Sequence, residues 1–356
     1  MVDNSSAGRR GSLVVMISSP LEPELVDLIR ATPVVSEVLY DPILLPPARY
    51  PNDHGGDPTF RRTEAQELRW REMLSRADAL IGYPQESAGE LARVLEQAPR
   101  VRFVQGTSAG MGAHIRRAEL SREVLERVNF ASAAGVHAGM LAEFVFYGLL
   151  WLRKDAARLA EIRAAQAWTH YAMGELQGST VAVVGMGHIG RAVASRARAF
   201  GMEVLAVTRT AAPEPLADSV FPTTELTQAF RRTDAVVLTL PLTPLTTGLI
   251  STKVLGALRP TAVLCNVGRG AVIDQPALLE LLQVGRLAGA VLDVFAEEPL
   301  PPGHPLWTME NVVLSPHTAA LSVHESRRIV ELFCKNLSRL AADEPLLSAV
   351  NLREFY

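Results

Sequence analysis

The sequence predicts an α/β protein with two doubly wound domains, each built on a parallel sheet. Short apolar segments of strand type alternate with helical segments, and this alternation is typical of parallel sheets. The alternation occurs twice, before and after a long helical stretch with an apolar face at Ala138 to Lys154. With 356 residues, the chain is also long enough to fold as two domains.

The first alternation runs to about residue 130. Thr63 and Gln66 have the spacing of a capping box, which marks the start of a helix. The spacing of apolar residues predicts the other strands and helices of this part of the chain. The predicted strands are 12–18, 34–40, 78–83 and 101–105, and the predicted helices are 22–31, 63–77 and 89–97.

Residues 42–58 carry no strand or helix pattern. They are rich in Pro, Gly, Asn and Asp, so we expect a long surface loop that is either functional or mobile. Asp53 and His54 could reach a substrate from this loop, but the favoured interpretation is that they are mobile surface residues.

The second alternation begins at residue 180 and predicts a second parallel sheet. Its predicted strands are 180–184, 202–207, 235–240, 262–266, 289–293 and 312–315. A helix is predicted at 191–200, and a last long helix at 321–342.

A glycine-rich turn follows the first strand of the second series, in the sequence Gly185-Met186-Gly187-His188-Ile189-Gly190. Strand, glycine turn and helix form the context in which this motif binds a dinucleotide. Gly185 allows the tight turn, Gly187 lets the backbone approach a pyrophosphate, and Gly190 lets helix pack closely on strand. His188 and Ile189, in the same turn, are also predicted to bind the cofactor, and the N–H groups at the N-terminus of the following helix favour phosphate. A simple structural turn is the alternative interpretation.

The next strand ends in Thr208-Arg209-Thr210, where an NAD-binding fold usually carries an acidic residue for the ribose 2′-hydroxyl. Without that acid, nothing repels a 2′-phosphate, and Arg209 and the two hydroxyls can bind one. The sequence therefore predicts a preference for NADP(H), with NAD(H) possible. The alternatives are an ordinary surface arginine and an arginine that stacks on adenine without selecting the phosphate.

Composition excludes several other classes of protein. A net charge of −3 without a dense basic block disfavours nucleic acid as a partner. The two cysteines, Cys265 and Cys334, form no disulfide framework and no metal-ligand cluster. The longest apolar run is too short to span a bilayer, and Met1 to Gly11 lacks the apolar core of a signal peptide. We therefore expect a soluble cytoplasmic protein with a disordered N-terminus and no metal site.

Three residues after successive strands could perform acid–base chemistry on a bound 2-oxo acid. Arg269 suits a bidentate contact with a carboxylate, and a carboxylate such as Glu298 would stabilise a protonated His317 as proton donor. Alone, each has a structural interpretation: an arginine in a capping loop, a glutamate on a solvated turn, and a histidine in a tight turn. Because all three follow strands of a nucleotide-binding sheet, catalysis is favoured.

The ordered motifs of the chain resemble those of the D-isomer-specific 2-hydroxyacid dehydrogenase family. The resemblance extends from about Val101 to Tyr356. It rests on Gly185 to Gly190, Leu240 to Pro244, Asn266 to Gly270, Leu292 to Pro299, and Ser315 to His317. It implies a Rossmann cofactor domain, residues 131–321, inserted in a flavodoxin-like substrate domain, residues 1–130 with 322–356. A crevice between the domains would hold the substrate.

The resemblance also implies residue roles. Arg269, Glu298 and His317 would be catalytic, and Asp293 would contact the nicotinamide carboxamide. The backbone N–H groups of Ser108, Ala109 and Gly110 would bind the substrate carboxylate together with Arg269. The family is usually dimeric, so we expect a homodimer, in which Trp168 is either an interface residue or an ordinary packed aromatic. Further residues implied to line the cofactor are Leu240, Pro241, Thr243, Val267 and Gly268.

Residues 305–307 and 208–210 resemble the glyoxylate/hydroxypyruvate reductase branch, which often prefers NADPH. We therefore expect an enzyme that reduces a small 2-oxo acid, such as glyoxylate or hydroxypyruvate, to the D-2-hydroxy acid. One alternative is a dehydrogenase of the same superfamily for phosphite or a bulkier 2-oxo acid; formate is disfavoured because no glutamine precedes His317. Another alternative is a non-catalytic NAD(P)-sensing binding protein.

Overall fold

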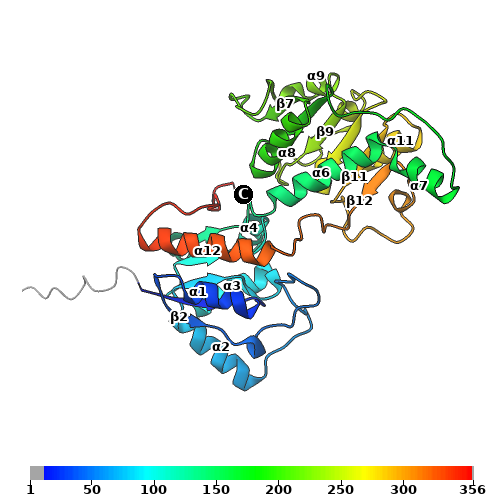
Figure 1. Ribbon diagram of the computed structural model, residues 1–356. Helices are drawn as coiled ribbons and strands as arrows, with labels where there is room; N and C mark the ends of the chain where they lie inside the picture. Colours follow the sequence, from blue (N-terminus) through cyan, green and yellow to red (C-terminus); the bar gives the residue numbers. More distant parts are fainter. Residues whose placement is uncertain (1–11, 355–356) are drawn as a thin grey trace, which may run out of the picture. The chain divides into compact units, whose positions relative to one another are not determined.

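The computed structural model describes residues 12–354, which form two compact units (Figure 1). Unit 1 comprises the chain up to His137 and again from Leu321 onward, and unit 2 comprises Ala138–Ala320. The break after His137 lies beyond the predicted boundary at residue 130, because β5 (Asn129–Ala131) pairs with the sheet of unit 1. The prediction for Met1 to Gly11 falls outside the described residues.

Unit 1 has a parallel five-stranded sheet in the order β2-β1-β3-β4-β5. Besides β5, its strands are β1 (Leu13–Ile17), β2 (Val35–Leu39), β3 (Ala79–Ile81) and β4 (Phe103–Gln105). Its helices are α1 (Pro23–Arg30), α2 (Glu64–Arg76), α3 (Ala88–Gln97), α4 (Met111–Arg117), α5 (Arg122–Arg127) and α12 (Glu325–Ala341), with 3₁₀ turns η1 (Pro42–Leu44) and η2 (Pro84–Glu86).

The ends of two helices show how local sequence sets their positions. Helix α2 begins with the predicted capping box, in which Thr63 Oγ1 accepts from Gln66 N–H (3.3 Å) and Gln66 Oε1 accepts from Thr63 N–H (2.8 Å). Helix α12 starts at Glu325, later than the predicted residue 321. Its buried face includes Phe333, which stacks on Phe103 of β4 with ring centroids 5.7 Å apart.

Unit 2 has a parallel seven-stranded sheet in the order β12-β11-β10-β9-β6-β7-β8. Both sheets are parallel, so the predicted fold class is confirmed. The strands are β6 (Thr180–Val184), β7 (Glu203–Thr208), β8 (Ser219–Pro222), β9 (Ala235–Leu238), β10 (Val263–Asn266), β11 (Gly289–Leu292) and β12 (Val312–Leu314). The helices are α6 (Ala138–Arg153), α7 (Ala156–Ala164), α8 (His188–Ala199), α9 (Leu226–Phe230), α10 (Thr252–Leu255) and α11 (Gln275–Gln283), with 3₁₀ turns η3 (Thr223–Glu225), η4 (Gly270–Val272) and η5 (Pro305–Trp307).

The strand order of unit 2 reverses between β6 and β9. The chain runs outward from β6 to β7 and β8, then returns to the other side of β6 and continues from β9 to β12. In such sheets, ligands bind beyond the carboxyl ends of the strands at the point of reversal. This topology therefore places the glycine-rich turn, which directly follows β6, at the position where a dinucleotide would bind.

Much of the loop at residues 42–58 is exposed, as predicted, but Asp53 and His54 are not the mobile surface residues that were expected. Asp53 and His54 are buried, with 4% and 6% of their surface exposed. The Asp53 carboxylate accepts hydrogen bonds from the guanidinium of Arg49 (2.7 and 3.0 Å) and the backbone N–H of Gly56 (3.1 Å). Burial by itself raises the pKa of Asp53, but these hydrogen bonds outweigh it and lower the pKa to about 2.

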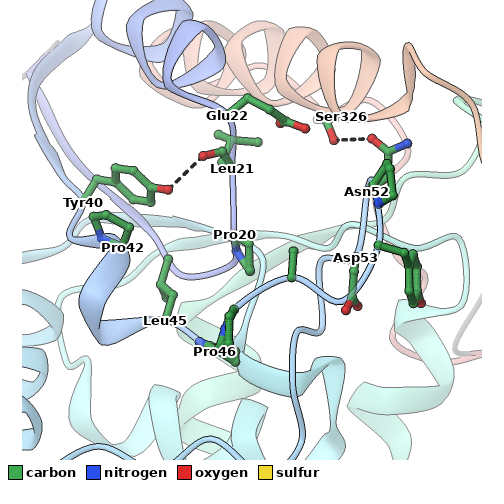
Figure 2. Close-up of a pocket in the computed structure, with 14 residues that line it drawn as sticks. Pro20, Leu21, Glu22, Tyr40, Pro42, Leu45, Pro46, Asn52, Asp53 and Ser326 are labelled. Carbon is green, nitrogen blue, oxygen red and sulfur yellow. Dashed lines mark hydrogen bonds between the residues drawn. The ribbon is translucent and has the colours of Figure 1, made fainter.

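The same loop is bonded to the segment that leads into α12. Asn52 Nδ2 donates to the backbone carbonyl of Ser322 (2.8 Å), and Ser326 Oγ donates to Asn52 Oδ1 (2.7 Å; Figure 2). These partners lie far away in the sequence, so composition alone could not predict the burial. Part of the loop also lines a pocket of about 430 Å³. Proline, leucine and tyrosine side chains make up most of its walls (Figure 2).

No helix within residues 12–354 is long and apolar enough to cross a membrane.

Candidate active site

The glycine-rich turn between β6 and α8 is held by close backbone contacts. Gly185 has a φ of +97°, a conformation that favours glycine. A Cβ on Gly190 would lie 1.9 Å from the carbonyl oxygen of Gly185, so only glycine fits where the helix returns to the strand. A Cβ on Gly187 would meet no atom within 4 Å. The structure of the turn requires the first and third glycines, whereas the second faces open space.

The N-terminus of α8 has the features of a phosphate-binding site. Gly187 is the N-cap residue, and no side chain caps the helix. Gly187 and His188 are exposed, and among the described residues no acceptor is bonded to the backbone N–H groups of His188, Ile189 or Gly190. Uncapped N–H groups and the positive end of the helix dipole favour an anion here. These residues therefore fit the pyrophosphate of a dinucleotide.

The end of β7 carries no carboxylate at residues 208–210. Thr208 is the last residue of the strand, and its hydroxyl oxygen is buried without a hydrogen-bond partner in the described chain. The nearest acidic residue in the sequence beyond this turn, Glu214, is already bonded to Arg191, with N–O distances of 3.1 and 3.0 Å. The electrostatics of this strand end are therefore compatible with an additional phosphate.

The loops after β9 and β10 approach each other closely. A Cβ on Gly268 would lie 2.7 Å from the carbonyl oxygen of Leu240, so the two backbones are in contact. Beyond Leu240, the Thr246 hydroxyl donates to the carbonyl of Pro241 (2.6 Å) and accepts from Thr243 N–H (2.8 Å). Two neighbouring loops, each held by hydrogen bonds, thus carry the residues predicted to line the cofactor: Leu240, Pro241, Thr243, Val267 and Gly268.

Arg269 follows β10 and is held by Asn266, the last residue of that strand. The Asn266 side chain is buried; its Nδ2 donates to the carbonyl of Arg269 (3.1 Å) and its Oδ1 accepts from Gly268 N–H (3.1 Å). Burial lowers the pKa of Arg269, while the charges of Glu298 and Asp293 raise it. An arginine keeps its charge under such a shift, so a cation lies near two carboxylates.

His317 and Glu298 form a hydrogen-bonded pair. Nδ1 of His317 lies 2.7 Å from Oε2 of Glu298, and Oε1 of Glu298 accepts from the backbone N–H of Phe295 (2.9 Å). The His317 side chain is 46% exposed, so its ring is accessible. Because Nδ1 is engaged with the carboxylate, Nε2 is the ring nitrogen left to exchange a proton with a ligand.

Asp293 positions the segment that carries His317. Its buried carboxylate accepts from the Ser315 hydroxyl (2.8 Å) and from Ala319 N–H (3.0 Å), and its backbone carbonyl accepts from His317 N–H (2.9 Å). His317 itself has a φ of +54°, which is uncommon for a residue with a side chain. Strained backbone of this kind persists where the surroundings hold it, and it clusters at functional sites.

The structure therefore places Arg269, Glu298 and His317 after β10, β11 and β12, three neighbouring strands of one sheet. The predicted substrate-binding residues Ser108, Ala109 and Gly110 lie in unit 1, between β4 and α4. Within residues 12–354 no acceptor is bonded to their N–H groups, whereas the Ser108 carbonyl accepts from Ala133 N–H (3.0 Å).

Sequence reasoning did not assign roles to Asn266 and Ser315, which hold the loops that carry Arg269 and His317. Both residues lie inside the motifs that carry the family resemblance. A polar residue at the buried end of an apolar strand was the available signal, because such a side chain needs a nearby backbone partner.

Known proteins are similar to this chain in sequence and in fold. Residues 147–319 match the family model for the NAD binding domain of D-isomer specific 2-hydroxyacid dehydrogenases. The glyoxylate reductase of Korarchaeum cryptofilum is 35% identical over 276 residues, which are 75% of this chain and 80% of that protein. This chain belongs to the D-isomer-specific 2-hydroxyacid dehydrogenase family.

Solved structures of this dehydrogenase family agree in fold. A D-isomer specific 2-hydroxyacid dehydrogenase from Xanthobacter autotrophicus, in complex with NADPH and MES, has a TM-score of 0.74 and 26% identity, with 97% of this chain and 100% of that chain covered. A family protein from Aeromonas salmonicida has a TM-score of 0.76 over 96% of this chain and 99% of that chain, at 24% identity. The predicted resemblance is confirmed, and the chain is a nicotinamide-dependent oxidoreductase of this family.

Proposed function

We propose that the enzyme reduces a small 2-oxo acid to the D-2-hydroxy acid, with NADPH as the preferred cofactor. The observation that carries this proposal is the pair of His317 and Glu298 on the strand ends next to Arg269. A reduction of this kind requires a cation for the carboxylate, a proton donor for the developing alkoxide and an orienting group. The three side chains supply one group for each need.

Each residue has a defined task in this proposal. The Arg269 guanidinium binds the substrate carboxylate and polarises the neighbouring carbonyl. His317 gives the proton on Nε2 to the carbonyl oxygen, and Glu298 holds Nδ1 and stabilises the positive charge of the ring. A bound nicotinamide would supply the hydride, and Asp293 would contact its carboxamide. The free N–H groups at Ser108 to Gly110 would bind a substrate carboxylate.

The preference for NADPH rests on the end of β7. Residues 208–210 contain two hydroxyls and a guanidinium but no carboxylate, and the Thr208 hydroxyl has no hydrogen-bond partner among the described residues. A 2′-phosphate would accept from such donors, and no acid at this position would repel it. The structure from Xanthobacter autotrophicus, which contains NADPH, supports a cofactor of this kind.

Small 2-oxo acids are the substrates we favour because curated relatives are glyoxylate reductases, including those of Korarchaeum cryptofilum and Thermofilum pendens. Glyoxylate and hydroxypyruvate are the first candidates. A dehydrogenase for phosphite or bulkier 2-oxo acids, and a non-catalytic sensor, lack a comparable supporting observation.

We also propose a homodimer that uses the exposed aromatic face of α6. Tyr147 and Trp151 are 53% and 37% exposed, and Phe144, Tyr147 and Trp151 form a ladder with centroid distances of 6.4 and 5.9 Å. Trp168 is 93% exposed. Large aromatic side chains on one helix face are typical of subunit interfaces, where their burial stabilises association.

The proposed function is tested by initial-rate oxidation of NADPH and NADH, side by side, with a panel of 2-oxo acids from glyoxylate upward. We expect the largest kcat/KM with NADPH and the small acids. A preference for NADH would contradict the assignment of Arg209 while leaving the catalytic residues in place. Turnover only of long or branched acids would contradict the substrate class.

A further inference from the structure

The segment after β3 has an unusual backbone. Gln85 and Glu86 of η2 have φ angles of +56° and +44°, so two successive residues with side chains adopt the left-handed conformation. Such a conformation costs about 1 kcal/mol or more for each residue, and it clusters at binding sites. The loop at 42–58 packs against this segment, because Gln85 Nε2 donates to the carbonyl of Pro58 (3.4 Å). The backbone is thus held in a conformation that fixes the direction of Glu86.

Glu86, which follows β3, is hydrogen-bonded to Thr107, which follows the neighbouring strand β4. The Thr107 hydroxyl, which is buried, donates to Glu86 Oε1. Strands β3 and β4 pair in register from Ala79 with Phe103 to Ile81 with Gln105, so the residues that follow both strands share one edge of the sheet. Glu86 is therefore bonded to the residue immediately before Ser108, where the free backbone N–H groups begin.

Among residues 12–354, no lysine, arginine or histidine forms an ion pair with the Glu86 carboxylate. Burial raises the pKa of the neighbouring Tyr83, and the charge of Glu86 raises it further while Arg117 lowers it, so the Tyr83 hydroxyl keeps its proton. A half-buried carboxylate without a cation favours hydrogen-bond donors and positive charge and disfavours other anions.

We propose that Glu86 determines which substituent the 2-oxo acid carries on C3, by accepting a hydrogen bond from a hydroxyl there and repelling a carboxylate. The inference rests on the proposed function, because Ser108 to Gly110 must bind the substrate carboxylate. If that carboxylate binds to the N–H groups after Thr107, the Glu86 side chain, which is bonded to Thr107, would lie beside the rest of a small substrate. The substrate class is therefore 2-oxo acids with a hydrogen-bond donor on C3, such as hydroxypyruvate, or without C3, such as glyoxylate.

Four 2-oxo acids that differ at C3 test which substituent the enzyme accepts. Glyoxylate has no C3, pyruvate has a methyl group there, hydroxypyruvate has a hydroxyl, and oxaloacetate has a carboxylate. For the wild type we expect kcat/KM for hydroxypyruvate to exceed that for pyruvate by about 10-fold or more. The methyl group of pyruvate offers no hydrogen-bond donor to the Glu86 carboxylate. Oxaloacetate should be the poorest of the four.

Two substitutions test the role of the charge and of the acceptor. Glu86→Gln keeps an acceptor oxygen, so it should retain the preference for hydroxypyruvate over pyruvate but raise kcat/KM for oxaloacetate by about 10-fold. Glu86→Ala removes the acceptor and should abolish the preference for hydroxypyruvate. Thr107→Val should act in the same direction as Glu86→Ala, and Thr107→Ser should restore the wild-type ratios because it keeps the hydroxyl.

A control variant and the wild-type rates distinguish failure of this inference from failure of the proposed function. Glu96→Gln, which removes an exposed charge from α3, should alter none of the substrate ratios. Wild-type turnover with substrate ratios that the Glu86 variants leave unchanged would overturn this inference alone. Absence of turnover by the wild type with every 2-oxo acid would overturn the proposed function and this inference with it.

Discussion

Nδ1 of His317 lies 2.7 Å from Oε2 of Glu298, although the two residues follow different strands and are 19 positions apart in the chain. The second oxygen of Glu298 is held by the backbone N–H of Phe295, and the backbone of His317 is held by Asp293. These hydrogen bonds hold Glu298 and His317 in place without a ligand, so the pair is preorganised before any substrate binds.

Replacement of His317 should remove the proton donor. We expect His317→Ala to lower kcat by about 10²- to 10⁴-fold, which is the usual contribution of a positioned acid. NADPH affinity should stay nearly unchanged, because the glycine-rich turn lies after a different strand. Steady-state kinetics with glyoxylate and NADPH fluorescence titration measure the two effects. Unchanged turnover would refute the assignment.

Glu298 should act through His317. Glu298→Gln keeps the shape of the side chain but removes the charge that stabilises the protonated ring, so kcat should fall by about 10-fold or more. The double variant of Glu298→Gln with His317→Ala should be no slower than His317→Ala alone, because residues that act as a unit are not additive. Additive losses in kcat would show that the two side chains act independently.

Arg209 should select the cofactor. Arg209→Ala should lower kcat/KM for NADPH by about 10-fold or more, since a charge-assisted hydrogen bond to phosphate is lost. The same substitution should leave kcat/KM for NADH almost unchanged. Equal losses with both cofactors would mean that Arg209 contacts a part common to both, such as adenine.

Two glycines of one turn should respond differently to alanine. In Gly190→Ala the new Cβ would lie 1.9 Å from the carbonyl of Gly185, so we expect destabilisation of about 2 kcal/mol or more and a lower Tm. In Gly187→Ala the Cβ would meet no atom within 4 Å, so Tm should be kept while dinucleotide affinity falls. Thermal melts and cofactor titrations of both variants check this contrast, which equal Tm values would contradict.

Acid should loosen the loop at 42–58. The pKa of Asp53 in the folded chain, about 2, lies below the value of an unfolded aspartate. The carboxylate therefore stabilises the loop above about pH 4, and this stabilisation is lost as the pH falls towards 2. Hydrogen exchange, corrected for intrinsic rates, should show falling protection of the loop over this range. Asp53→Asn should show low protection already at neutral pH, and a pH-independent loop in the wild type would contradict this account.

The aromatic face of α6 should be needed for association. Tyr147→Asp places a charge within the aromatic ladder and should convert a dimer to a monomer, as measured by light scattering after gel filtration. Leu68→Asp is the matched control, because Leu68 is 65% exposed on α2 and is not part of this face. A wild type that is monomeric at micromolar concentration would refute the proposed dimer.

Most of the fold was predictable from the sequence, because apolar periodicity is a local property. The run from Thr180 to Val184 is β6, as predicted, and Thr63 and Gln66 cap α2. Strand β8 was missed because its residues are mixed in polarity and lie at the edge of the sheet, where only one neighbour stabilises them. Helix α8 starts at His188 rather than 191 because an uncapped glycine begins it.

The sequence by itself determined the family, the parallel sheets and the identity of the candidate residues, since motif spacing and residue chemistry are written along the chain. Only the tertiary structure decided which of those residues meet. The contact of Glu298 with His317, the burial of Asp53 and the bond of Thr107 to Glu86 join segments that are separate in sequence. Such contacts depend on strand order and loop direction, which arise from packing of the whole unit rather than from any local pattern.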